Sequence, residues 1–570
     1  MYRHLYRPVF TVLSLLVFLG CQSRQPLTSA DAKLIAAADQ RPNILIVMVD
    51  DMGFSDPGCY GGEIQTPNLD RLAGAGVRFT QFYNTSRCCP TRAALLTGLY
   101  PHQAGVGQMT SDRGEAYPGY RGRLTPNAVT IAEVLRENGY RTGMVGKWHV
   151  SLTGGPAGEN RLAWLNHQAF FEEDFSDRNS YPTARGFEKY YGNIWGVVNY
   201  FDPFSLVNGE EPVRDVPHDF YYTDAISDTA VAYIENFSKG EDPFFLYVAH
   251  CAPHWPLHAR PEDIAKYRDT YKEGWDAVRR RRYERQLKMG LFEAANSQLP
   301  DPTERTIAWE EEPRREWEAQ AMAVHAAMID CVDQGLGRII AKLEETGELN
   351  NTLILFLSDN GASPERPQQP GFDRNSETRE GKAVHYSDFT MTPGPENTYT
   401  GIGRYWANAA NTPFRYWKAR TFEGGITTPL IAHWPAGIRV APGGIDRSPG
   451  HVIDLMATCL DAAGADYPQT YEGRAITPLE GKSLLPALQQ GRREGHETIF
   501  FEHFTAKAIR QGDWKAVCLP RQDKWELYNL AEDRTETNDL AETMPEKVAE
   551  LKALWQKEAE RLQVFPQPER

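Results

Sequence analysis

Positive charge is scarce relative to negative charge in this chain of 570 residues, and cysteines are few. The formal net charge is −15, and since no stretch offers a broad basic surface, we expect no nucleic-acid partner. The eight cysteines show no C-x-x-C spacing, which argues against a zinc site and a disulfide framework, although one isolated bridge stays open. Internal repeats and low-complexity tracts are also lacking. A chain of this length can bury one large core and a smaller one.

The first residues predict an export signal and not a membrane-spanning helix. Two arginines precede an apolar run from Val9 to Leu19, which is too short to span a bilayer comfortably. The run ends in Phe18-Leu19-Gly20-Cys21, which resembles a bacterial lipobox. We therefore expect residues 1–21 to be a lipoprotein-type signal, with a lipid on Cys21 that anchors an exported protein in the periplasm or at the outer membrane. Plain secretion is the alternative, and the polar residues 22–40 are predicted to form a linker.

Alternating strand and helix patterns predict an α/β fold. Continuous apolar runs typical of strands buried on both faces lie at 43–49, 244–248, 352–357 and 429–432. Helical patterns lie between and beyond them, at 130–138, 222–237, 319–345 and 452–463. This alternation indicates a large, mostly parallel sheet sandwiched between helices.

The pattern changes after about residue 466, which predicts a large domain over residues 41–466 and a small α+β domain over 467–570. Short strand patterns at 498–504, 508–517 and 525–529 suggest an antiparallel meander, and residues 545–562 an amphipathic helix.

Two long insertions interrupt the large domain. Residues 259–318 are highly charged and include four consecutive arginines, Arg279 to Arg282, on a predicted helix. A solvated helix face explains this run better than a patch for an anionic substrate. Residues 362–413 are rich in Pro, Gly, Asn, Ser and Thr without a period, and loops of this length usually cap or line a site.

Asp50-Asp51 directly follows the first predicted strand, and Asp359-Asn360 follows the strand that ends near Leu357. Either pair alone would be typical of a turn. In open α/β sheets, however, ligands gather at the carboxyl ends of the strands, so the two pairs could meet in space. Three carboxylates and one amide oxygen suit a hard cation such as Ca²⁺ or Mg²⁺, and no Cys/His cluster competes to make a zinc site.

The most specific pattern in the chain is Cys88-Cys89-Pro90-Thr91-Arg92, followed by Leu96-Thr97-Gly98. It resembles the formylglycine site of type I sulfatases, C-x-P-x-R with L-T-G behind it, with Cys88 in the modified position and Cys89 in the variable one. Further motifs of that family follow in order: Gly146-Lys147-Trp148-His149, Ala252-Pro253-His254-Trp255-Pro256, and Lys418 ahead of Glu423-Gly424-Gly425. The chain is thus identified as similar to the arylsulfatase-like branch of the type I sulfatases, in the alkaline-phosphatase-like superfamily.

This resemblance implies a fold, a reaction and a set of site residues. The fold would be alkaline-phosphatase-like, with residues 41–466 as the catalytic domain. A maturation enzyme would oxidise Cys88 to formylglycine, whose hydrate attacks the sulfur of a sulfate monoester. The cation, Ca²⁺ in preference to Mg²⁺, would be bound by Asp50, Asp51, Asp359, Asn360 and residue 88.

The family's basic residues would bind the sulfate and transfer protons. Arg92, Lys147 and Lys418 would hold the sulfate oxygens and the hydrate. His254 would protonate the leaving oxygen, and His149 would take a proton from the second hydroxyl of the hydrate so that sulfate departs. Outside such motifs, each histidine would be typical of a hydrogen-bonded structural residue.

Two other functions stay open at this point. Phosphonate monoester hydrolases and phosphodiesterases of the same superfamily share the aldehyde and the metal. A glycan-binding lipoprotein without activity would result if Cys88 stayed unmodified. The motifs suit an aryl sulfate and a sulfated sugar equally well.

Overall fold

The computed structural model describes residues 41–568, apart from 157, 159, 167–173 and 305. The signal segment, the linker and the expected lipid on Cys21 lie outside these residues and stay predictions. Within the described part, no helix is both long and apolar enough to cross a membrane.

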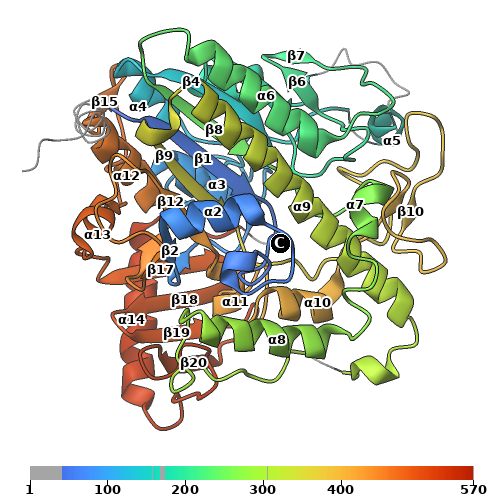
Figure 1. Cartoon of the computed structure of the whole chain (residues 1–570). Helices are drawn as coiled ribbons and strands as arrows, with labels where there is room; N and C mark the ends of the chain where they lie inside the picture. The colour runs from blue at the N-terminus through green and yellow to red at the C-terminus, as the bar shows by residue number, and fades with distance from the viewer. Residues whose placement is uncertain (1–40, 157, 159, 167–173, 305, 569–570) are drawn as a thin grey trace, which may run out of the picture.

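A ten-stranded sheet runs through the molecule (Figure 1). The order across it is β13 (Gly444–Asp446), β2 (Val77–Phe79), β12 (Leu430–His433), β9 (Thr352–Ser358), β1 (Asn43–Val49), β8 (Phe244–Ala249), β4 (Arg141–Gly146), β5 (Lys189–Asn193), β6 (Leu206–Asn208) and β7 (Glu211–Pro212). The central strands β9, β1, β8, β4 and β5 are parallel, whereas β12, β6 and β7 pair antiparallel with their neighbours. The predicted mostly parallel mixed sheet is confirmed.

Helices cover both faces of this sheet, and successive residues of β1 face opposite layers. Ile44 and Met48 share a core with α3, α4 and α12, whereas Leu45 and Val47 share one with α2, α6 and α9. All of β1 is buried, which explains its continuous apolar run. These helices are α2 (Pro67–Ala75), α3 (Cys88–Thr97), α4 (Ile131–Glu137), α6 (Tyr222–Phe237), α9 (Arg315–Glu345) and α12 (Asp454–Ala463).

The C-terminal part forms a separate antiparallel sheet, in the order β17 (Thr498–His503), β18 (Ala506–Gln511), β19 (Trp514–Cys518) and β20 (Trp525–Asn529). The helix α14 (Pro545–Arg561) packs against it. The single strand predicted over 508–517 is wrong, because the chain turns at Gly512, which has a φ of 57°, and forms a hairpin there. The domain boundary after residue 466 stays a prediction.

The remaining elements are short and connect or cover the two sheets. The helices are α5 (Asn160–Leu165), α7 (Pro261–Ala265), α8 (Trp275–Lys288), α10 (Gly403–Ala410), α11 (Glu423–Ile426) and α13 (Leu485–Gln490). The strands are β3 (Phe82–Tyr83), β10 (His385–Tyr386), β11 (Thr398–Tyr399), β14 (Gly450–His451), β15 (Thr470–Tyr471) and β16 (Arg474–Ala475). All seven cysteines from Cys59 to Cys518, the ones that the structure describes, are free thiols.

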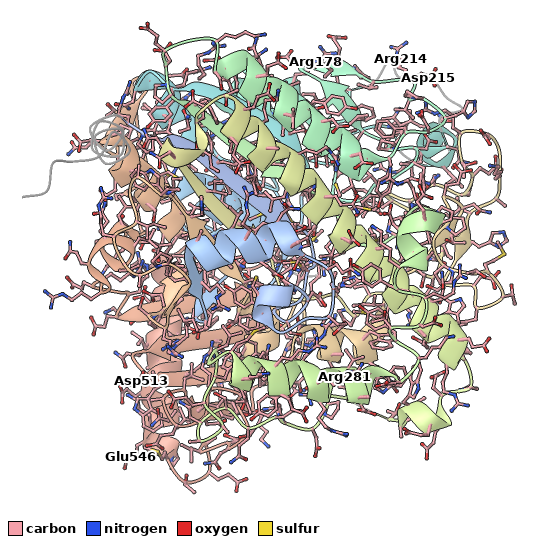
Figure 2. All side chains as sticks on the ribbon, in the orientation of Figure 1. Arg178, Arg214, Asp215, Arg281, Asp513 and Glu546 are labelled. Carbon is pink, nitrogen blue, oxygen red and sulfur yellow. The ribbon has the colours of Figure 1, made fainter. Side chains whose placement is uncertain are left out.

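The arginine run on α8 is only half solvated, so the prediction of a solvated face is wrong for part of it. Arg281 lies towards the outside (Figure 2), with 36% of its side chain exposed. Arg279 and Arg282 are buried. The Arg282 guanidinium pairs with Asp56 and Glu63, acidic residues that lie far away in the sequence.

Candidate active site

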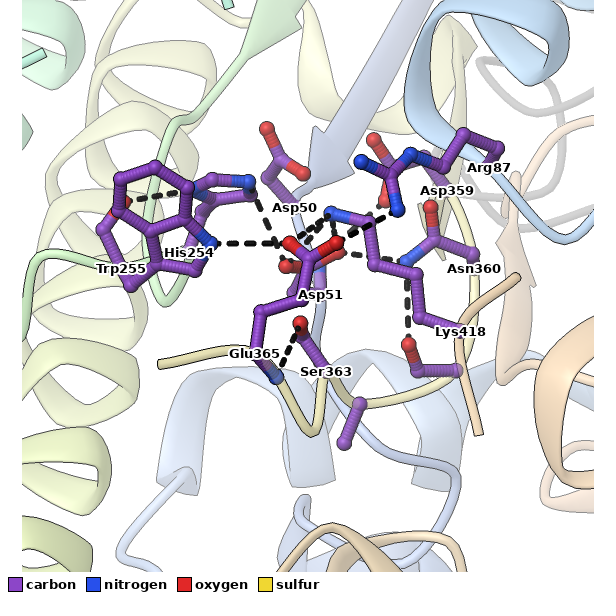
Figure 3. A network of polar contacts seen from close by, with 12 residues as sticks. Asp50, Asp51, Arg87, His254, Trp255, Asp359, Asn360, Ser363, Glu365 and Lys418 are labelled. Carbon is purple, nitrogen blue, oxygen red and sulfur yellow. Dashed lines mark hydrogen bonds and ion pairs between the residues drawn. The ribbon is translucent and has the colours of Figure 1, made fainter. Parts of the chain in front are cut away.

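The register of the central strands brings the two acidic pairs together. Val49 of β1 is paired with Ser358 of β9, so Asp50-Asp51 and Asp359-Asn360 leave neighbouring parallel strands at the same edge. Asp51 N donates to Asp359 Oδ1 at 3.2 Å, and Asn360 Nδ2 donates to Asp51 Oδ1 at 2.6 Å. These four side chains lie close together (Figure 3).

Their oxygens fit a hard metal ion. Asp50 Oδ1 and Asn360 Oδ1 are buried and accept no hydrogen bond from any residue that the structure describes. A buried oxygen without a partner is costly unless a ligand satisfies it. Ligand atoms of Asp50, Asp51 and His254 also lie within 4.8 Å of one another. Carboxylate and amide oxygens are the donors that Ca²⁺ and Mg²⁺ prefer.

Two buried cationic side chains neutralise the carboxylates of Asp50 and Asp359. Lys147, the residue that directly follows β4, pairs with Asp50. Arg92 of α3 lies 3.1 Å from Asp359 and 3.4 Å from Asp50. Burial raises the pKa of Asp50, but the charges of Lys147, His254 and Arg92 outweigh it and lower the pKa to about 2. Burial and the charge of Asp50 raise the pKa of Asp359 well above its usual value.

Lys418 pairs with Asp51, the second carboxylate that follows β1. Its Nζ lies 2.7 Å from Asp51 Oδ1 and 2.8 Å from Asp51 Oδ2, and its side chain is fully buried. Burial lowers the pKa of Lys418, but the charges of Asp51 and residue 88 outweigh it and raise the pKa. Lys418, the lysine predicted ahead of the E-G-G segment, therefore pairs with the same acidic pair, Asp50-Asp51, as Lys147 does.

Cys88 begins α3 and is 2% exposed. Ligand atoms of Cys88, Cys89 and His149 all lie within 4.8 Å of one another. A hydrogen bond with Cys89 and the charge of Lys147 lower the pKa of the Cys88 thiol well below its usual value, although burial opposes them. Burial raises the pKa of Cys89, whose Sγ points to Gln108 O at 3.3 Å. The pKa values of the two thiols are thus shifted in opposite directions, and Cys88 is the one whose thiolate the site favours.

The two histidines leave different strands. His149 follows β4, and its ring packs so closely on Gly196 that a Cβ there would lie 2.4 Å from the imidazole. Burial lowers the pKa of His149 to about 4. His254 follows β8, with Nε2 3.5 Å from Asp51 Oδ2 and Nδ1 donating to Trp255 O at 2.5 Å. Burial and the charge of Lys418 lower the pKa of His254.

The backbone is strained at several positions around these side chains. The φ values are 66° at Asp51, 66° at Ser86, 57° at His149 and 65° at Ala419, in the left-handed region that residues other than glycine rarely adopt. Such conformations persist only where the surroundings impose them, and they cluster at functional sites.

Sequence reasoning missed two side chains at this site. Arg87 precedes Cys88, and Glu365 lies in the long insertion that follows β9. The two pair at 2.7 Å. Arg87 could have been suspected from its place beside the Cys88 motif, whereas nothing in the Pro- and Gly-rich sequence around Glu365 marks it.

Two family models match the chain. One, described as Sulfatase, matches residues 42–465. The chain belongs to the sulfatase family. The second, described as N-sulphoglucosamine sulphohydrolase, C-terminal, matches residues 414–564. This sulfatase is therefore a sulfuric ester hydrolase, and its reaction is the hydrolysis of sulfate esters.

Curated relatives agree over most of the length. The sulfatase is 33% identical to an uncharacterized sulfatase of Schizosaccharomyces pombe, over 91% of this chain and 93% of the relative. It is 33% identical to an arylsulfatase of Klebsiella aerogenes, over 80% of this chain and 95% of the relative. It is 26% identical to an N-acetylgalactosamine-6-sulfatase of Rattus norvegicus, over 89% of this chain and 77% of the relative.

Solved structures share the fold. A protein in complex with k-i-k-neocarrahexaose aligns with a TM-score of 0.62 at 24% identity, over 93% of this chain and 98% of the other. One in complex with its substrate D-glucosamine-2-N,6-O-disulfate aligns with a TM-score of 0.60 at 21% identity, over 92% and 99%. The predicted alkaline-phosphatase-like α/β fold, with a smaller C-terminal antiparallel part, is confirmed.

Proposed function

We propose that this sulfatase cleaves sulfate monoesters of sugars with a formylglycine made from Cys88 and a Ca²⁺ ion bound by the carboxylates behind β1 and β9. One observation carries the proposal. Cys88 is the first residue of α3, and its buried thiol lies beside His149 and within reach of the charges of Lys147 and Lys418.

The carboxylate pairs and residue 88 form the metal site. The metal ligands are the side-chain oxygens of Asp50, Asp51, Asp359 and Asn360. Two of these oxygens, Asp50 Oδ1 and Asn360 Oδ1, have no hydrogen-bond partner among the described residues. The hydrated aldehyde supplies a nucleophile with two hydroxyls, and the cation supplies positive charge for the sulfate oxygens. Ca²⁺ is preferred over Mg²⁺ because an irregular set of carboxylates suits its flexible coordination.

The basic residues bind the anionic ester before attack. Lys147 pairs with Asp50 and Lys418 pairs with Asp51, and they bind the sulfate oxygens, which neutralises charge where it develops. Arg92 donates to Lys147 O at 2.8 Å and pairs with Asp359. It therefore keeps both the lysine backbone and the acidic pair in place.

The histidines move protons on opposite sides of the sulfur. His254, next to Lys418 and Asp51, donates a proton to the leaving oxygen. His149, next to residue 88, accepts a proton at that residue so that sulfate can depart. His149 Nδ1 is buried and has no hydrogen-bond partner in the described part of the chain, so the ring is not committed to a structural bond through that atom.

A sulfated sugar is the proposed substrate class. Relatives and structural neighbours carry the names of sugar sulfatases or were solved with sugars. This chain offers one exposed aromatic ring near the site. Phe372 is 53% exposed and stacks on the buried Trp195 with ring centroids 6.4 Å apart. Trp195 precedes Gly196, which contacts the His149 ring, and an exposed ring such as that of Phe372 suits the face of a sugar.

The location is part of the proposal. The apolar run before Cys21 and its lipobox-like end favour an exported lipoprotein. Labelling with a lipid precursor should mark the wild-type protein and spare Cys21→Ser, whereas equal labelling of both would contradict the anchor.

The function is tested by measuring hydrolysis of sulfated sugars, nitrophenyl sulfate and matched phosphonate esters, by sulfate release for the sulfate esters and by alcohol release for the phosphonates. Faster hydrolysis of the phosphonates would instead indicate a phosphonate monoester hydrolase. Mass spectrometry of the Cys88 peptide from a host with a maturation enzyme checks the nucleophile. An unmodified, inactive protein that still binds glycans would indicate a non-catalytic lipoprotein.

A further inference from the structure

Glu365, on the loop that follows β9, joins three segments around the site (Figure 3). Its Oε1 accepts a hydrogen bond from Arg87 Nη1 at 2.7 Å, and its Oε2 accepts one from Trp255 Nε1 at 3.0 Å. The same Oε2 lies 3.9 Å from Lys418 Nζ. One carboxylate therefore contacts the segment before α3, the segment behind β8 and the lysine itself.

The backbone of Glu365 is held from outside the site, which fixes the direction of the carboxylate. Ser363 Oγ accepts from Glu365 N at 3.2 Å. Gly401 lies against the Glu365 carbonyl, and a Cβ there would come within 2.1 Å of its oxygen. The next residue, Arg366, makes two bonds to Glu318 of α9 at 3.0 and 2.6 Å.

Lys418 faces two carboxylates that differ in role. Asp51 belongs to the proposed metal ligands, and Glu365 does not. An ammonium offers three donors, and negative charge that Asp51 shares with a cation is less available to Lys418. In this structure Lys418 Nζ bonds to Asp51 and lies 3.9 Å from Glu365 Oε2. With the charge of Asp51 shared with a metal ion, Glu365 is the remaining carboxylate that can orient the ammonium. Burial raises the pKa of Glu365, but Arg87 and Lys418 outweigh it and hold the pKa well below its usual value.

The contact with Trp255 extends to His254. The two rings are neighbours, with centroids 4.9 Å apart, and His254 Nδ1 donates to Trp255 O at 2.5 Å. A restraint on the indole through Glu365 therefore limits movement of the imidazole. The His254 Nε2 atom is left facing the acidic pair, 3.5 Å from Asp51 Oδ2.

We propose that Glu365 is a positioning residue, whose carboxylate aims the Lys418 ammonium at the sulfate and holds Trp255, and with it His254, on the leaving-group side. The inference rests on the proposed function, in which Lys418 and His254 act on the ester. Glu365 itself stays out of contact with the reacting atoms. Glu365 neither binds the metal nor contacts the sulfate, and it acts through Lys418 and Trp255.

The first test measures the affinity for inorganic sulfate by calorimetric titration into Ca²⁺-supplemented protein with unconverted Cys88. Without turnover, this affinity depends on whether the Lys418 ammonium is oriented towards the sulfate. Glu365→Gln should bind sulfate about tenfold more weakly than wild type, a common effect of losing a charged hydrogen-bonding partner. Glu365→Asp, which restores the charge, should recover part of the affinity. Glu380→Gln is the matched control, because Glu380 is an exposed glutamate of the same insertion that pairs with Lys382 at 2.9 Å, and it should bind as wild type does.

A double variant separates positioning from simple stabilisation. If Glu365 acts through Lys418, adding Glu365→Gln to Lys418→Met should weaken sulfate binding no further than Lys418→Met alone. Unchanged affinity in Glu365→Gln, or additive losses in the double variant, would overturn the proposal. A lower Tm with unchanged sulfate affinity would mean that Glu365 is purely structural.

Failure of the proposed function has a different signature. Wild-type protein with converted Cys88 would then release no sulfate from sugar sulfates, while the sulfate titrations would still measure the effect of Glu365. On active enzyme, Glu365→Gln should raise KM and slow sugar sulfates more than nitrophenyl sulfate, because His254 is loosened along with Lys418.

Discussion

Arg282 of α8 donates to Asp56 Oδ1 at 2.7 Å, and both side chains are fully buried. Asp56 in turn accepts from Gly53 N at 2.9 Å, two residues after Asp51. The same guanidinium makes two bonds to Glu63, at 3.0 and 2.6 Å. A helix of a long insertion thus fixes the loop that carries two of the proposed metal ligands.

Arg282→Met should therefore destabilise the protein and weaken Ca²⁺ binding. The variant leaves Asp56 buried without its guanidinium partner, and breaking a buried pair from one side costs about 3 kcal/mol. Arg281→Met is the matched control, because Arg281 pairs with Glu273 at the surface and such pairs contribute less than about 1 kcal/mol. Urea unfolding and Ca²⁺ titration of both variants measure the difference, and equal effects would contradict the assignment.

Much of the fold could be predicted because buried strands and amphipathic helices leave strong local patterns. The strand 43–49 and the helix 222–237 were predicted with the bounds that β1 and α6 have. The hairpin between β18 and β19 was missed although its turn carries a signal, Gly512-Asp513 between two strand-like runs. A G-D pair of this kind is typical of a tight hairpin turn.

The site could be predicted only where its residues sit in contiguous motifs or directly behind strands. Arg282 was misassigned because a run of arginines is ordinarily solvated, and its partners lie more than two hundred residues away in the sequence. Glu365 was missed because its partners are assembled by three separate segments. Long-range ion pairs of this kind depend on tertiary packing, which leaves no periodic trace in the sequence.

Cys88, and not Cys89, should be the modified residue. Cys88 stands two residues before Pro90 and lies among the site's cations, whereas the Cys89 thiol points to the Gln108 carbonyl. Peptide mass spectrometry of active protein should show the loss of mass from thiol to aldehyde on Cys88. Cys88→Ala should abolish turnover, and Cys89→Ser should be tolerated. Active enzyme with an unmodified Cys88 would refute this assignment.

Removal of the metal should inactivate the enzyme. Prolonged dialysis against a chelator should abolish sulfate release, and Ca²⁺ should restore it better than Mg²⁺. Asp50→Asn should lose both the ion and the activity, because Asp50 Oδ1 is a buried oxygen that can bind the metal and has no hydrogen-bond partner among the described residues. Asp513→Asn, on a side chain that is 66% exposed, serves as the control. Full activity of metal-stripped protein would contradict the site.

Acid should destabilise the protein through Asp454. Its carboxylate accepts hydrogen bonds from Arg493 at 2.8 Å and His496 at 2.5 Å. Burial raises the pKa of Asp454, but the bond and charge of His496 and the charge of Arg493 outweigh it and lower the pKa from 3.8 to about 2. Because the folded pKa lies below the ordinary one, the stabilisation is present above about pH 4 and is lost as the pH falls towards 2.

The size of this effect is about 2 kcal/mol. Urea unfolding of wild type and Asp454→Asn across this pH range measures it. The difference in unfolding free energy between the two proteins should shrink as the pH falls. A difference that stays constant with pH would mean that the carboxylate charge of Asp454 does not stabilise the fold.

The two histidines should be separable by leaving group. His254 lies beside Lys418 and Asp51, on the proposed leaving-group side. His254→Ala should therefore slow sugar or alkyl sulfates far more than nitrophenyl sulfate, whose leaving oxygen scarcely needs a proton. His149 lies beside residue 88 and acts after the ester bond is broken. His149→Ala should give a burst of alcohol product followed by a stall, with sulfate retained on the protein.

Measuring both variants on one good and one poor leaving group distinguishes these roles from structural ones. A histidine that only supports the fold would lower the Tm and slow both substrates by the same factor, because fewer molecules would be folded. The burst must also equal the amount of enzyme with converted Cys88, since each molecule turns over once before it stalls. Intact-mass analysis of the stalled His149→Ala protein checks for the retained sulfate. Equal losses on both substrates, with no burst and no retained sulfate, would refute the roles of both histidines while leaving the sulfatase reaction itself untouched.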